Sequence, residues 1–214
     1  MDRPNLVQAA IWAAVALAFA DSSIVVLALP DLLRQLDTSI EGVSLVITVY
    51  NVAVVLSTPV VLLLVRGAGA RRCLHAGLAL FALGSAGCAA AGTLELLVAL
   101  RGVQAIGGAL LLASALPTLG ARRWSVAAAV GAALGPAIGG LLTEALDWRA
   151  IFAFQTPVAL VALVAGWRAA TPQLALQGRR DRGNLRVNLA LALISGALVG
   201  ALFLVVILVI EVWG

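Results

Sequence analysis

Two charged residues lie inside long apolar segments, where an ionised side chain is unstable without a partner or a water-filled cavity. Asp21 comes eight residues before Leu29, where the first apolar segment ends. Arg101 comes seven residues after Leu94, where the fourth begins. At 1.5 Å per residue, both lie about 10–12 Å below the same face of a membrane core roughly 30 Å thick. We therefore expect Asp21 and Arg101 to face each other across a central cavity.

Such a pair could take up and release a proton. Burial disfavours the ionised form of Asp21 and a nearby guanidinium favours it, so a small rearrangement can change its protonation state. Arg101 stays protonated and cannot be the titrating member of the pair. The alternative is that each charge separately reaches the membrane surface or is hydrated by water.

Two polar neighbours extend this candidate site. Gln104 follows Arg101 by one helical turn and projects from the same face. It could bind a substrate or hold the guanidinium, and a plain interhelical hydrogen bond is an equally open interpretation. Ser22 directly follows Asp21 and is the second candidate for the lining of a substrate cavity.

A run of small residues marks the fifth apolar segment. Gly131, Gly135 and Gly139 recur every four residues and form one smooth helix face, which lets two helix backbones approach closely. Pro136 removes a helical hydrogen bond and can kink the helix. Together with Gly140, these residues predict close packing, a hinge in a moving helix, or both.

The composition of the chain indicates the class of protein in which these residues are placed. The chain of 214 residues is 63% hydrophobic and 11% charged, whereas soluble domains are about half apolar and about a quarter charged. This argues against a soluble enzyme, a disordered chain and a disulfide-stabilised domain. The sequence has no HExxH, no paired catalytic carboxylates and no nucleotide-binding loop, so we expect no enzymatic activity and no cofactor.

The apolar segments predict an all-α polytopic membrane protein with about seven transmembrane helices, because only helices satisfy their own backbone in lipid at this segment length. The helices are expected at residues 6–29, 43–65, 73–92, 94–116, 124–142, 150–167 and 187–210. The links are expected at residues 31–42, 66–72, 93, 117–123, 143–149 and 168–186. Residues 1–168 would form a six-helix unit, residues 169–186 a basic cytoplasmic linker, and residues 187–214 the seventh helix.

The arginines predict the orientation of the chain. The chain has 14 basic residues, all arginine, and most fall in links on the side of the N-terminus, whereas Arg34 and Arg149 fall on the opposite side. This asymmetry predicts a cytoplasmic N-terminus in a bacterial-type inner membrane. It also indicates a lipid bilayer, not nucleic acid, as the partner of the basic residues. Gly69, Arg71 and Arg72 are expected in a cytoplasmic loop.

Four motifs resemble the N-terminal half of a major facilitator superfamily transporter, and in particular the fourteen-helix drug:proton antiporters. Residues 21–30 resemble the helix 1 motif of that branch, and Leu97, Arg101, Gln104 and Gly107 its helix 4 motif. Residues 131–140 match the helix 5 motif G-x-x-x-G-P-x-x-G-G without a mismatch. Residues 148–157 are similar to W-R-x-I-F-x-x-N-x-P at the start of helix 6, with Gln155 in place of Asn.

The resemblance implies efflux of amphipathic small molecules, with the proton gradient as the energy source and no cofactor. It implies that Asp21 and Arg101 take part in proton coupling. It also implies that helices 1–3 and 4–6 are inverted repeats, with a binding site near the middle of the membrane.

Two departures from the family bear on whether this chain can transport. Leu62 and Arg66 stand where the family has Gly and Asp in the loop between helices 2 and 3, and that Asp is part of a conformational latch. Alternating access needs two six-helix halves, and this sequence supplies one half and one further helix. The chain could be a truncated remnant that does not transport, or a half that needs a partner or a second copy. An uptake carrier or channel is a further alternative, which the helix 5 motif disfavours.

Overall fold

The computed structural model describes residues 3–168, so the expected linker at 169–186 and the expected helix at 187–210 lie outside the described residues. The described chain consists of α1 (Arg3–Ile24), η1 (Val25–Ala28), α2 (Leu29–Gln35), α3 (Ile40–Ala68), α4 (Ala70–Ala90), α5 (Leu94–Leu119), α6 (Ala121–Ala145) and α7 (Arg149–Arg168). Within it, six helical segments are long and apolar enough to cross a membrane, the first being the continuous stretch Asn5–Gln35. The all-α, multi-pass fold predicted from the sequence is confirmed.

One predicted loop is replaced by a single glycine. The link expected at residues 66–72 consists only of Gly69, because α3 continues to Ala68 and α4 begins at Ala70. Gly69 has a φ of +90°, a conformation that residues with a Cβ rarely adopt, and this allows the abrupt reversal of the chain. Arg71 and Arg72 are therefore exposed in the first turn of α4 and do not lie in a loop.

Three of the other predicted links are also shorter in the structure, since the helices extend beyond their most apolar residues, whereas the turn predicted at residue 93 is longer and covers residues 91–93. The link expected at residues 117–123 is reduced to Gly120, with a φ of +75°, between α5 and α6. At the opposite end of the bundle, polar caps begin two helices. The side chain of Ser39 accepts a hydrogen bond from the backbone of Gly42, and that of Thr93 from the backbone of Leu96.

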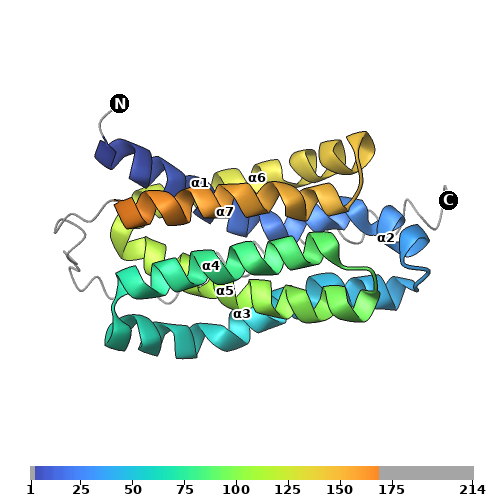
Figure 1. Cartoon of the computed structure of the whole chain (residues 1–214), viewed down its shortest axis with the longest axis horizontal. Helices are drawn as coiled ribbons and strands as arrows, with labels where there is room; N and C mark the ends of the chain where they lie inside the picture. The colour runs from blue at the N-terminus through green and yellow to red at the C-terminus, as the bar shows by residue number, and fades with distance from the viewer. Residues whose placement is uncertain (1–2, 169–214) are drawn as a thin grey trace.

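The helices lie side by side along the long axis of the molecule (Figure 1). The main contacts pair α4 with α5, α1 with α6, α3 with α5, α4 with α7 and α1 with α7. The first three spans contain α1, α3 and α4, and the last three are α5, α6 and α7. If each helix of the first set is exchanged with its counterpart in the second, the α1–α6 contact becomes α5–α3 and the α4–α5 contact becomes α7–α1. The α4–α7 pair is unchanged by the exchange. The packing thus has the symmetry that two inverted three-helix repeats produce.

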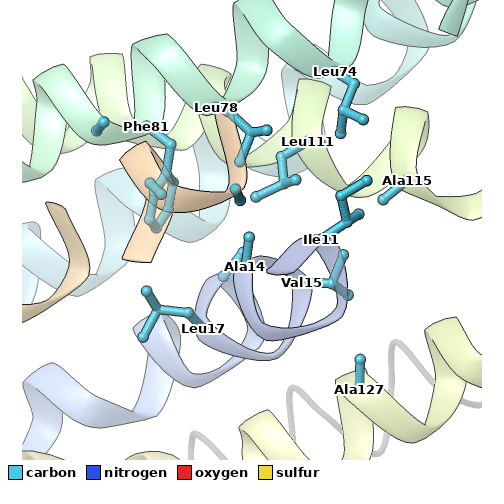
Figure 2. Close-up of a cluster of buried hydrophobic side chains, with 14 of the residues drawn as sticks. Ile11, Ala14, Val15, Leu17, Leu74, Leu78, Phe81, Leu111, Ala115 and Ala127 are labelled. Atoms are coloured by element: carbon cyan, nitrogen blue, oxygen red, sulfur yellow. The ribbon is translucent and has the colours of Figure 1, made fainter. Parts of the chain in front are cut away.

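Two of the three buried apolar clusters in the described residues include residues of α1. In the first, Ile11 of α1 packs near Leu111 and Ala115 of α5 (Figure 2). This cluster ends on α1 at Ala18, and the second cluster begins at Ile24. The intervening turn of α1 carries Asp21, so the charged residue lies at the level between the two apolar clusters.

Large apolar side chains also cover the outside of the bundle. On α3, Val55 is 70% exposed, Leu56 71% and Leu63 66%. Such a surface is unfavourable in water and is typical of helices that face lipid or another membrane-embedded surface.

Candidate functional site

Asp21 and Arg101 form an ion pair in the centre of the bundle. Nη1 of Arg101 donates to Oδ2 of Asp21 at 2.6 Å, and both side chains are 0% exposed. The predicted contact is confirmed, but the predicted cavity between the two side chains is wrong. The side chains touch because α1 and α5 pack directly against each other.

Arg101 is fixed by α3 as well as by Asp21. Its Nε donates to the backbone oxygen of Val46 at 3.2 Å. Its guanidinium carbon lies 4.2 Å from the ring centre of Tyr50 and 5.5 Å from that of Phe152. Within residues 3–168, Nη2 has no hydrogen-bond partner. The cation therefore has aromatic and carbonyl partners that do not depend on the carboxylate.

The second oxygen of Asp21 accepts hydrogen bonds from two amides. Nε2 of Gln155 on α7 lies 2.5 Å from Oδ1 of Asp21, and Nε2 of Gln104 lies 3.4 Å from the same atom. Gln104 also accepts from Nη1 of Arg101 at 2.9 Å. Both glutamines are completely buried. Gln104 thus lies on the same face of α5 as Arg101 and holds its guanidinium, which is one of the interpretations left open by the sequence. Its place in a substrate cavity remains a prediction.

Gln155 is the member of this site that sequence reasoning missed, since it stands out in the sequence only as a departure from a motif. The available signal was an amide within an otherwise apolar segment, since a buried amide in a membrane needs partners of its own.

Helix α4 completes the network through Ser85. Nε2 of Gln104 lies 2.9 Å from Oγ of Ser85 and 2.6 Å from Oε1 of Gln155. The hydroxyl of Ser85 donates to the backbone oxygen of Phe81 at 2.8 Å. Asp21, Arg101, Gln104, Gln155 and Ser85 are called the buried polar cluster below. It joins α1, α4, α5 and α7 at one level of the bundle.

Ser22 does not belong to this cluster. Its hydroxyl donates to Oδ1 of Asn51 on α3 at 3.0 Å, and the residue is only partly buried. Ser22 therefore connects α1 with α3 beside the cluster, and its predicted place in a substrate cavity remains a prediction.

The glycine face of α6 packs against the part of α1 that carries Asp21. A Cβ at Gly131 would overlap the carbonyl of Ala16, and one at Gly139 would overlap the carbonyl of Ile24. A Cβ at Gly135 would overlap Oγ of Ser23. Close backbone packing is thus the observed role of this face, as small residues at this spacing predict.

The predicted hinge is not visible as a break in the helix. α6 is continuous from Ala121 to Ala145 through Pro136. Gly140 has more space, with the nearest atom, Cδ1 of Leu27, 3.2 Å from an added Cβ. A hinge role for Pro136 and Gly140 remains a prediction.

The chemistry of the buried polar cluster follows from its charges. A carboxylate buried without water is stable only while its hydrogen bonds and its counter-ion are in place. Protonation would neutralise Asp21 and leave Arg101 as an uncompensated buried cation. The charge on Asp21 and the positions of the other members of the buried polar cluster therefore depend on each other.

A bundle of six membrane-spanning helices around a buried carboxylate–guanidinium pair has the architecture of half a membrane transporter. The sequence profile of the Major Facilitator Superfamily matches residues 11–213. The chain belongs to this family, whose members are transporters and not enzymes.

Two curated relatives carry names related to drug resistance. The Methylenomycin A resistance protein of Bacillus subtilis (strain 168) is 31% identical over 204 residues, which are 86% of this chain and 42% of that protein. The putative multidrug resistance protein MdtD of Escherichia coli O1:K1 / APEC is 32% identical over 194 residues, 85% of this chain and 41% of that protein. The chain thus spans about two fifths of the length of these relatives.

Proposed function

We propose that the chain forms the N-terminal half of a proton-coupled exporter of amphipathic small molecules. The buried ion pair between Asp21 and Arg101 carries this proposal. A carboxylate can hold a proton at this depth in one state of a transport cycle and release it in another, whereas a purely structural bundle is more easily built with apolar residues at both positions. The resistance functions in the names of the relatives support efflux as the direction.

The site also indicates how substrate and proton exchange could be linked. Arg101 and Asp21 compensate each other's charge, so a protonated Asp21 leaves the cluster with one net positive charge. A cationic substrate is repelled from the cluster in that state and tolerated when Asp21 is ionised. This antagonism favours exchange of an amphipathic cation for a proton, with no cofactor and with the proton gradient as the energy source.

Transport by alternating access needs two six-helix halves, and the described residues supply one. We propose that the second half comes from a second copy, from another polypeptide or from the rest of a longer protein. The proposed location is a bacterial-type inner membrane with the N-terminus in the cytoplasm, as the arginine asymmetry favours. The lipid bilayer and an amphipathic small molecule are the proposed partners.

Reconstitution into lipid vesicles tests the proposal. The full chain is placed in vesicles with an imposed pH gradient, and the movement of a lipophilic cationic dye is followed. Wild type is compared with Asp21→Asn and with the matched control Asp37→Asn. Asp37 is exposed in the turn after α2, and its φ of +45° is one that Asn also adopts.

Gradient-dependent dye movement that Asp21→Asn abolishes and Asp37→Asn preserves is the expected result. Movement that does not respond to Asp21→Asn would contradict proton coupling at this residue. Absence of movement from folded, inserted wild type would contradict transport by the chain alone and favour a half that needs a different partner or a non-transporting protein.

A further inference from the structure

We propose that Gln155 is a positioning residue for Asp21, and that the side-chain amides of Gln104 and Gln155 reverse together when Asp21 takes up a proton. The proposal deepens the proposed function, since it rests on proton binding at Asp21. It assigns a role to an α7 residue that contacts neither the membrane surface nor solvent.

The directions of the hydrogen bonds in the buried polar cluster are determined by its two charged members. Arg101 is only a donor, so the group of Gln104 that lies 2.9 Å from its Nη1 must be the carbonyl oxygen. The NH₂ group of Gln104 then faces Gln155, at 2.6 Å, and must meet the carbonyl oxygen there. The NH₂ group of Gln155 consequently points at Oδ1 of Asp21, at 2.5 Å. The hydrogen bonds therefore all run in one direction: Arg101 donates to Gln104, Gln104 donates to Gln155, and Gln155 donates to Asp21.

A proton on Asp21 does not fit this arrangement. Oδ1 receives hydrogen bonds from two NH₂ groups, and Oδ2 receives one from Arg101. A protonated carboxyl group is itself a donor and needs an acceptor. Tyr50 on α3 and Cys88 on α4 are the other titratable groups of the described residues that act on this carboxylate, and the hydroxyl of Tyr50 already donates to the backbone oxygen of Ala18 at 3.3 Å. The step adds one proton from solvent to the carboxylate and breaks no covalent bond, but it places a donor against the NH groups of Gln155, Gln104 and Arg101 in a fully buried site, which is costly.

Reversal of the two amides relieves this conflict at Asp21 and transfers it to Arg101. A reversed Gln155 presents Oε1 to the protonated Asp21 and its NH₂ group to Gln104. Gln104 must then reverse as well, which turns its NH₂ group towards the donor-only guanidinium of Arg101, breaks that hydrogen bond and favours displacement of the Arg101 side chain. Ser85 can follow either arrangement, because a hydroxyl both donates and accepts. Proton uptake on α1 is thereby transmitted to α7, α4 and the Arg101 side chain.

Infrared spectroscopy of the purified full chain tests this proposal without a transport assay. Difference spectra between high and low pH report the carboxylic acid C=O band of Asp21, identified by its absence in Asp21→Asn. Labelling glutamine with ¹³C identifies the side-chain amide bands. Variants at the site are Gln155→Met, which keeps the length of the side chain and removes the amide, and Gln155→Asn, which shortens it. Thr156→Val is the control on the same helix, since the hydroxyl of Thr156 donates to the backbone oxygen of Phe152 on that helix.

In wild type, we expect the glutamine bands to change over the same pH interval as the acid band of Asp21. Loss of a hydrogen bond to the carboxylate favours the protonated form. Gln155→Met should therefore increase the acid-band intensity relative to wild type at the same pH and remove most of the glutamine change. Gln155→Asn should fall between this variant and wild type. Thr156→Val should match wild type in both bands.

Glutamine bands that stay constant while the acid band appears would overturn the reversal of the amides. A folded Gln155→Met protein with the titration of wild type would overturn the positioning role, and Gln155→Asn provides the same test where Gln155→Met does not fold. An acid band that never appears between pH 4 and pH 10 would overturn proton binding itself. The first two results leave the proposed transport function standing, and the third does not.

Discussion

The guanidinium carbon of Arg101 lies 4.2 Å from the ring centre of Tyr50, and the hydroxyl of Tyr50 donates to the backbone oxygen of Ala18 at 3.3 Å. Tyr50 therefore links the buried cation to α1, one turn before Asp21. A cation over a desolvated aromatic ring is stabilised by about 2 kcal/mol. The ring contributes to holding Arg101 in place when Asp21 is neutral.

Tyr50→Phe should lower the free energy of unfolding only slightly, by about 1 kcal/mol, because the ring stays and one hydrogen bond is lost. Tyr50→Leu should cost about 2 kcal/mol more, since it also removes the aromatic face. Denaturant-induced unfolding in detergent micelles measures both. Equal losses for the two variants would show that the hydroxyl, and not the ring, is the stabilising part.

Removal of one charge of the central pair should destabilise the chain more than removal of both. Asp21→Asn leaves Arg101 buried without a counter-ion, at a cost of about 3–5 kcal/mol. Arg101→Met leaves the carboxylate in the same situation. The double variant should unfold at a higher denaturant concentration than either single variant, since a neutral buried pair has no unpaired charge. Strict additivity of the two effects would contradict direct contact between the charges.

The exchange of the two charges provides a stricter test of the same contact. Asp21→Arg combined with Arg101→Asp keeps one positive and one negative group in the bundle. We expect more folded protein from this double variant than from either single change, measured by the monodisperse fraction after purification. A double variant that folds no better than the single variants would argue against the pairing.

Substitution in the glycine face of α6 should separate this helix from α1. Gly131→Ala places a methyl group on the carbonyl of Ala16, and such overpacking costs about 1–3 kcal/mol. The control is Gly102→Ala on α5, where the nearest atom lies 3.9 Å from the added Cβ. This change should be neutral or stabilising by about 0.5–1 kcal/mol, because alanine favours a helix over glycine. Thermal unfolding that ranks the two variants in the opposite order would refute the backbone contact.

Gln35 at the end of α2 holds the start of α7, and its loss should loosen α2. Its Oε1 accepts from Nε1 of Trp148 at 3.1 Å and from Nη1 of Arg149 at 3.0 Å. Gln35→Ala leaves the indole of the buried Trp148 without this acceptor, which costs about 1–3 kcal/mol. Hydrogen exchange should become faster in residues 29–36. Gln8→Ala, near the other end of the bundle, is the matched control and should leave exchange in these residues unchanged.

The helices and the contact between Asp21 and Arg101 could be predicted from the sequence because both depend on distances along the chain. Segment length gives the spans, and the distance from a segment end gives the depths of Asp21 and Arg101. Most predicted links are too long because polar residues such as Arg71 and Arg72 continue a helix beyond the membrane core, which hydropathy does not reveal. Gln155 was missed because its role depends on which helix faces α1, and the hydropathy of α7 does not contain that information.

The single-residue links also determine where the bundle can open. One residue spans at most about 3.6 Å, so the end of α3 cannot move away from the start of α4 at Gly69, nor α5 from α6 at Gly120. The α3–α4 junction and the α5–α6 junction lie at the same end of the molecule (Figure 1). At the other end, residues 36–39, 91–93 and 146–148 leave more chain between helices. Each of these helix pairs is therefore held together at its glycine. When such a pair opens, the separation between its two helices is largest at their opposite ends, beyond the level of Asp21.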